Sequence, residues 1–82
     1  MAGPTRRYVD HLVDQEHRFS LSTEPATDQH HLAVAVSAPL VDYELRYQLT
    51  AGELAALLAD HAAAVALAER CRAGLEDARL LA

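Results

Sequence analysis

Residues 50–72 read TAGELAALLADHAAAVALAERCR, and this stretch decides the fold. Thr50 can cap a helix N-terminus through its hydroxyl, and Glu53, three residues later, completes a capping box. Alanine, leucine and glutamate dominate the rest, and alanine is the best helix former. Two arginines in the last turn, with Gly74 just beyond it, are typical of a helix C-terminus. The stretch therefore predicts one long helix.

Apolar residues surround most of this predicted helix. At about 100° per residue they form a main stripe, with His61 inside it, and a weaker second stripe. The main stripe contains Leu54, Leu57, Leu58, Ala62, Val65 and Ala68. The second stripe contains Ala56, Ala63, Ala64, Leu67 and Cys71. Because one small sheet covers only one side of a helix, we expect the second stripe to form an interface with another subunit or partner; the alternative is that its alanines simply face water.

The segment before the helix contains the clearest strand. From Val41 to Leu49 apolar and polar residues alternate strictly, so one face meets the core and the other meets water. Residues 31–37 and the stretch that begins at His17 alternate in the same way. Residues 8–16 are compatible with a short helix or with an irregular strand. Three sequential strands joined by short links predict an antiparallel meander.

These elements predict an α+β domain: an antiparallel sheet of about three strands, with one long C-terminal helix packed across one face, assembled as a dimer. Residues 1–7 are expected to form a flexible N-terminal arm, and residues 8–82 to form a single domain. A chain of 82 residues buries a modest fraction of its surface, which is a further reason to expect assembly.

The composition argues against several classes of function. The net charge of −5 and the absence of tryptophan argue against a nucleic-acid-binding surface. No apolar run approaches the length of a membrane span, and the N-terminus lacks the apolar segment of a signal peptide. The single cysteine cannot form an internal disulfide, so we expect a cytoplasmic protein without membrane or nucleic-acid partners. No known family is recognised in the sequence.

His61 is the most informative of the five histidines, because it lies on the main apolar stripe of the predicted helix. A buried neutral imidazole needs a hydrogen-bond partner, and Tyr43 or Tyr47 on the core face of the preceding strand could supply a hydroxyl. If the protein is an enzyme or binds a ligand, its pocket is expected between sheet and helix. The candidate catalytic residues for that case are His61, Tyr43, Tyr47 and His17.

The other histidines match no metal-binding motif. His30 and His31 are adjacent, so on a strand they point to opposite faces. We therefore predict no metal site and no cofactor. A histidine metal site is the third alternative, and it requires at least two of His11, His17, His30 and His31 to converge.

No catalytic constellation emerges from the sequence, which contains neither a glycine-rich phosphate loop nor a nucleophile elbow. We therefore favour a small non-enzymatic protein-interaction module, such as an accessory, regulatory or immunity-type subunit, that acts through its apolar helix face. Its expected partners are a second copy of itself and, in addition, another protein. The alternative is a small enzyme or ligand-binding protein with a pocket lined by histidine and tyrosine.

Overall fold

The computed structural model of this chain describes residues 8–37 and 39–81. The strands within them are β1 (Val9–Asp14), β2 (Phe19–Glu24), β3 (Gln29–Ser37) and β4 (Asp42–Leu49). The helices are α1 (Ala51–Ala59), α2 (His61–Arg72) and a short 3-10 helix, Asp77–Arg79. The predicted α+β class is confirmed. Residues 1–7, predicted to form a flexible arm, lie outside the described residues.

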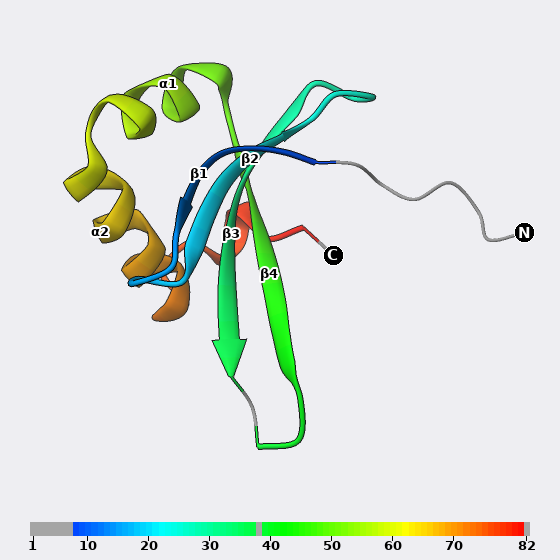
Figure 1. The fold of residues 1–82 in the computed structure, drawn as a ribbon, viewed down its shortest axis with the longest axis vertical. Helices are drawn as coiled ribbons and strands as arrows, with labels where there is room; N and C mark the ends of the chain where they lie inside the picture. Colours follow the sequence, from blue (N-terminus) through cyan, green and yellow to red (C-terminus); the bar gives the residue numbers. More distant parts are fainter. Residues whose placement is uncertain (1–7, 38, 82) are drawn as a thin grey trace, which may run out of the picture.

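The four strands form one antiparallel sheet in the order β1-β2-β3-β4, so the meander has one strand more than the sequence predicts. Leu21 of β2 pairs with Leu32 of β3, which pairs in turn with Tyr47 of β4. Both helices lie on the same side of this sheet (Figure 1). The described residues therefore form two layers, and none of their helices covers the other face of the sheet.

The additional strand is β1, which lies in residues 8–16, where the sequence pattern is compatible with either a helix or a strand. Its pairing with β2 shifts register between Asp10 and Leu12. Two steps along β1 match a single step along β2, so His11 is the extra residue of a β-bulge. The bulge interrupts the period of two in the apolar pattern, which explains why alternation does not reveal this strand.

The prediction of one long helix is wrong, because residues 50–72 form two helices that meet at Asp60. Asp60 has extended backbone angles (φ −136°, ψ 95°), and its carboxylate accepts a hydrogen bond from the Ala63 amide at 3.2 Å. Aspartate is a strong N-cap residue but a poor helix-interior residue, because its side chain competes for backbone amides. It therefore ends α1 and begins α2. The predicted capping box of Thr50 and Glu53 is confirmed at the start of α1.

The hydrophobic core lies between the helices and one face of the sheet. The sheet contributes Phe19, Leu21, Leu32, Val34, Tyr47 and Leu49. The helices contribute Leu54, Leu57, Ala64, Ala68 and Cys71. The break at Asp60 changes which helix residues face inward, so Leu58 of the predicted main stripe is exposed whereas Ala64 of the second stripe is fully buried.

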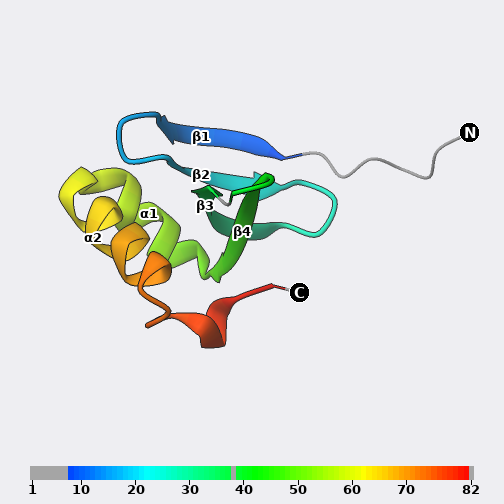
Figure 2. The same cartoon turned by 90° about the horizontal axis from the view of Figure 1, so that it is seen from below.

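The C-terminal segment returns to the sheet and runs beside β4 (Figure 2). Leu80 forms an isolated bridge with Tyr47, and the Leu81 amide donates to a β4 carbonyl at 2.9 Å. Arg79 pairs with Glu53, the acidic residue of the α1 capping box, at 2.6 Å. The segment thus protects part of the outer edge of β4 and ties it to the first helix.

Candidate functional site

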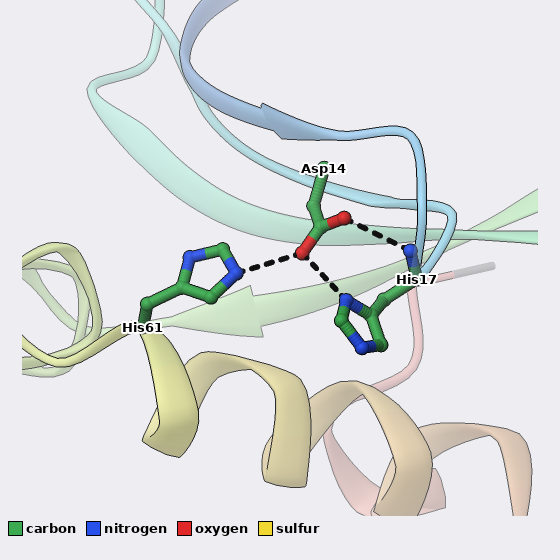
Figure 3. A group of neighbouring side chains, drawn as sticks. All are labelled: Asp14, His17 and His61. Carbon is green, nitrogen blue, oxygen red and sulfur yellow. Dashed lines mark hydrogen bonds and ion pairs between the residues drawn. The ribbon is translucent and has the colours of Figure 1, made fainter.

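Three polar side chains converge between the sheet and the start of α2: Asp14, His17 and His61 (Figure 3). Oδ2 of Asp14 lies 2.9 Å from Nδ1 of His17 and 2.8 Å from Nε2 of His61. One ligating atom from each residue lies within 4.8 Å of the others. Asp14 ends β1 and His17 follows three residues later in the β1–β2 turn, whereas His61 begins α2, so the fold brings the distant start of α2 to this turn.

The β1–β2 turn brings His17 back onto Asp14. Through Oδ1, the Asp14 carboxylate accepts a hydrogen bond from the His17 amide at 2.9 Å, as aspartates often do in turns. Arg18 follows with a positive φ of 59°, which turns the chain into β2. Arg72 of α2 donates to the backbone carbonyl oxygens of His17 and Arg18. The end of α2 therefore holds the turn that presents His17.

The break between the two helices places His61. This residue is the first of α2 and follows directly on the capping residue Asp60. Its ring lies near those of Phe19 and His17, with ring centroids 6.1 Å and 6.3 Å away. His61 therefore lies at the margin of the sheet beside Asp14, not in the buried stripe that an unbroken helix predicts.

The carboxylate of the cluster is buried, whereas both imidazoles are accessible. The exposed fractions of the side chains are 7% for Asp14, 34% for His17 and 55% for His61. The hydrogen bond from the His17 amide lowers the pKa of Asp14 from 3.8 to about 2; burial opposes this shift and the His17 ring adds to it. The hydrogen bond to Asp14 raises the pKa of His17. At neutral pH the site is thus a buried anion that faces two imidazole rings.

This donor set suits a divalent metal ion. Imidazole nitrogen and carboxylate oxygen are common ligands of Zn²⁺, at about 2.0–2.2 Å. Tetrahedral bonds of that length place two ligand atoms about 3.3 Å apart. To admit the ion, the contacts of 2.8 and 2.9 Å must open by about 0.5 Å, and the two ring nitrogens, which lie within 4.8 Å of each other, must adjust to the same spacing. Two histidines and one carboxylate also form the ligand set of many non-haem Fe²⁺ sites.

A groove of about 470 Å³ lies next to this cluster, between the sheet and the end of α2. His17, Tyr43 and Tyr47, three of the four residues predicted for a pocket, line it. His61, the fourth, contacts the carboxylate of the cluster, and the Tyr47 hydroxyl donates to the Cys71 carbonyl at 3.1 Å. The structure thus brings His17 and the two tyrosines to one groove. The sequence offers Tyr43 or Tyr47 as the hydrogen-bond partner of His61, but His61 contacts Asp14 in the structure.

The second helix stripe, predicted as an interface, divides between core and surface. Ala64 and Cys71 are buried in the core of this chain, and burial raises the pKa of the Cys71 thiol to about 11. Leu67 packs partly against the same core. Ala56 and Ala63 are exposed. Within this stripe, Ala56 and Ala63 are therefore the residues most accessible to a partner.

The remaining histidines lie apart from the cluster. Oγ1 of Thr23 lies 2.7 Å from Nε2 of His11 and 2.8 Å from Nδ1 of His30. His31 is fully buried, on the sheet face opposite to that of its core neighbours in β3. Of the four histidines named for a possible metal site, His17 is the one that joins the cluster.

Sequence reasoning did not select Asp14 and gave His61 a different partner. Two local signals were present. An aspartate three residues before a histidine, at the end of a strand, is a turn signal that can place both side chains together. A histidine directly after a capping aspartate begins a helix, where its ring can point away from the helix axis toward a neighbouring element.

Comparison with models of known families, with curated proteins and with solved structures finds no match for this chain. Among the described residues, no helix is both long and apolar enough to cross a membrane.

Proposed function

We propose that this protein is a small metal-binding protein in which Asp14, His17 and His61 hold one divalent transition-metal ion. The observation that supports the proposal is the convergence of three ligating atoms within 4.8 Å, two from the β1–β2 turn region and one from the start of α2. Zn²⁺ is the ion that we select, because it accepts mixed nitrogen and oxygen ligands in a tetrahedral geometry. The proposal departs from the prediction of no metal site, which rested on histidine spacing along the sequence alone.

The neighbouring hydrogen bonds support a defined role for each ligand. The His17 amide occupies Oδ1 of Asp14, which leaves Oδ2 directed at the two rings. His17 would coordinate through Nδ1 and His61 through Nε2, since these atoms face Oδ2. Such fixed orientation by a second hydrogen bond is usual for metal-ligating carboxylates. Three protein ligands leave one tetrahedral position for water or a further ligand.

Metal binding at this position would stabilise the fold. The Asp14–His17 pair and His61 lie on elements that separate when the chain unfolds, so the ion binds the native state far better than the unfolded chain. At a free ion concentration of 100 times the dissociation constant, the expected gain in free energy of unfolding is about 2.7 kcal/mol. The ion would thus act as a clamp between the β1–β2 turn and α2.

Isothermal titration calorimetry of Zn²⁺ into chelator-treated protein tests this function. We expect one ion per chain, and we expect His61→Ala and Asp14→Asn to abolish measurable binding. His11→Ala is the matched control, because it removes an exposed histidine that lies outside the cluster and should leave binding unchanged. Wild-type protein that binds no ion, or a His61→Ala variant that binds as well as wild type, would refute the proposal.

The outward face of the two helices favours protein–protein interaction as a second candidate function. Its exposed residues are small or apolar: Ala55, Ala56, Leu58, Ala59, Ala62, Ala63 and Ala66. We propose that the chain is a cytoplasmic interaction module that associates with itself and offers this helix face to another protein. Sedimentation equilibrium tests the self-association: a dimer supports it, and a monomer at all concentrations counts against it.

A further inference from the structure

The β3–β4 hairpin projects past the end of the helix layer and past the β1–β2 turn (Figure 1). Three large apolar residues near its end are exposed: Leu40 by 98%, Val41 by 64% and Tyr43 by 48%. Soluble monomers rarely keep large apolar side chains together in water, and a cluster of them marks an interaction surface more often than chance exposure. The exposed apolar residues at the end of the hairpin therefore indicate an interaction surface.

The core-facing side of β4 leads from the core to this exposed end. Along its alternating positions Leu49 is 4% and Tyr47 1% exposed, Leu45 is partly buried, and Tyr43 is 48% exposed. The residues between them, Glu44 and Gln48 among them, face the other side of the sheet. The apolar alternation thus continues through the whole strand, but the helices of this chain cover only the half nearer to α1. The half of β4 near the hairpin end thus has the alternating apolar pattern of a half-buried strand, but no helix of the described residues covers its apolar side.

The groove beside α2 extends this uncovered surface. Its floor includes Val34 and Val36 of β3 and Leu45 of β4, and Tyr43 belongs both to the groove and to the exposed end of the hairpin. The two surfaces therefore form one continuous apolar strip, which we call the hairpin face. It runs from the tip residues Leu40 and Val41 into the groove.

We propose that the hairpin face binds the hairpin face of a second copy of this chain. A two-fold dimer places the same surface on both subunits, so the surface must be self-complementary in shape and charge. The hairpin face meets the charge condition, because two arginines and two glutamates line its groove and leave no net charge to repel a second copy: Arg18, Arg72, Glu16 and Glu69, of which Arg72 and Glu69 pair at 3.0 Å within one subunit. The net charge of −5 would favour a partner with a basic surface. Such a basic partner would need an acidic patch to bind, and the balanced rim of the hairpin face does not provide one.

Sheet-on-sheet packing provides the geometry for this contact. Two apolar sheet faces pack about 10 Å apart with interdigitating side chains, and a protruding hairpin can reach a second copy without displacing the helices. Arg18 is fixed by Ser37 at 2.9 Å, and Arg72 is fixed by the β1–β2 turn, so the rim is already ordered in one subunit. The inference rests on the self-association proposed above and is independent of the metal site.

Sedimentation velocity of the full chain over a concentration series tests the proposal. We expect a dimer for wild type, and for Val41→Asp and Tyr43→Asp a dissociation constant raised by about thirtyfold or more, as for a lost central anchor of an interface. Both positions are exposed in the monomer, so the fold should survive, and far-UV circular dichroism together with the midpoint of urea unfolding verifies this. Leu58→Asp and Ala63→Arg, on the outward helix face, are the matched controls and should still form dimers.

Three outcomes would overturn the inference. A wild-type protein that stays monomeric throughout refutes both self-association and this interface, and leaves the hairpin face to a different molecule. A dimer that tolerates Val41→Asp and Tyr43→Asp but is lost in Ala63→Arg keeps self-association and moves the interface to the helices. A dimer that tolerates all four substitutions also refutes the hairpin interface, because neither apolar face then carries the contact.

Discussion

Replacing Asp60 by alanine tests whether the helix break positions the proposed metal ligand His61. The Asp60 carboxylate accepts a hydrogen bond from the Ala63 amide at 3.2 Å and so caps the start of α2. Loss of an N-cap side chain typically lowers the free energy of unfolding by about 1 kcal/mol. With a urea dependence of about 1 kcal/mol per molar for a chain of this size, the midpoint of urea unfolding should fall by about 1 M.

The same substitution should weaken metal binding. His61 is the first residue of α2, so fraying of the uncapped turn releases its ring from Asp14. We expect the dissociation constant for Zn²⁺ to rise about tenfold, at the lower end of the effect of groups that orient metal ligands. Asp60→Asn should restore both stability and affinity, because asparagine caps helices as well as aspartate does. Urea unfolding followed by circular dichroism and zinc calorimetry measure the two quantities separately.

Thr50→Ala is the control, because Thr50 caps α1 in the same way. Its hydroxyl accepts a hydrogen bond from the Glu53 amide at 3.1 Å, and α1 contributes no residue to the cluster. This variant should lose about 1 kcal/mol of stability as well, while its zinc affinity stays that of wild type. If Asp60→Ala and Thr50→Ala lose the same stability and both keep full zinc affinity, the idea that the break positions His61 is refuted.

Four further predictions concern the cluster and the core. In metal-free protein, the lowered pKa of Asp14 contributes stability that is present above pH 3.8 and lost as the pH falls toward about 2, and Asp14→Asn should flatten this acid limb of the urea midpoint. The raised pKa of His17 contributes stability that is present below pH 6.5 and lost as the pH rises through its folded value, so His17→Ala should remove this alkaline loss. Tyr47→Phe removes the hydroxyl that donates to the Cys71 carbonyl, which keeps the Gly74 amide as a donor at 3.1 Å, and this loss should cost about 1 kcal/mol in urea unfolding. The Cys71 thiol, buried and with its pKa raised to about 11, should react with a chromogenic disulfide reagent only at the rate of unfolding, and fast labelling of the native protein would contradict its burial.

The parts of the fold that sequence predicted are those where one local pattern acts alone. Strict alternation from Val41 to Leu49 gives β4, and the Thr50–Glu53 capping box gives the start of α1. The errors arise where two tendencies compete within a few residues. Asp60 stands between two strongly helical sequences, and its capping tendency prevails over theirs. At His11 a bulge shifts the register of β1, so the apolar residues on either side no longer alternate in phase.

The cluster could not be predicted in full because it depends on both of these exceptions. The bulged β1 ends at Asp14, and the turn that follows needs the positive φ of Arg18 to bring His17 back. The position of His61 depends on the break at Asp60, which a single continuous helix does not contain. A sequence pattern assigns residues to faces of ideal elements, whereas this site is formed where the elements depart from ideal geometry.

The second histidine is the feature that a purely structural role leaves unexplained. The buried charge of Asp14 needs compensation, and His17 supplies it through both its amide and its ring. His61 adds a contact to the same oxygen from a side chain that is 55% exposed, and water competes for its ring, so this contact contributes little to stability. As a metal ligand, however, His61 completes a donor set that the other two residues cannot provide alone. Loss of its imidazole should therefore remove metal binding while leaving the fold nearly intact, a separation that a cluster serving stability alone would not produce.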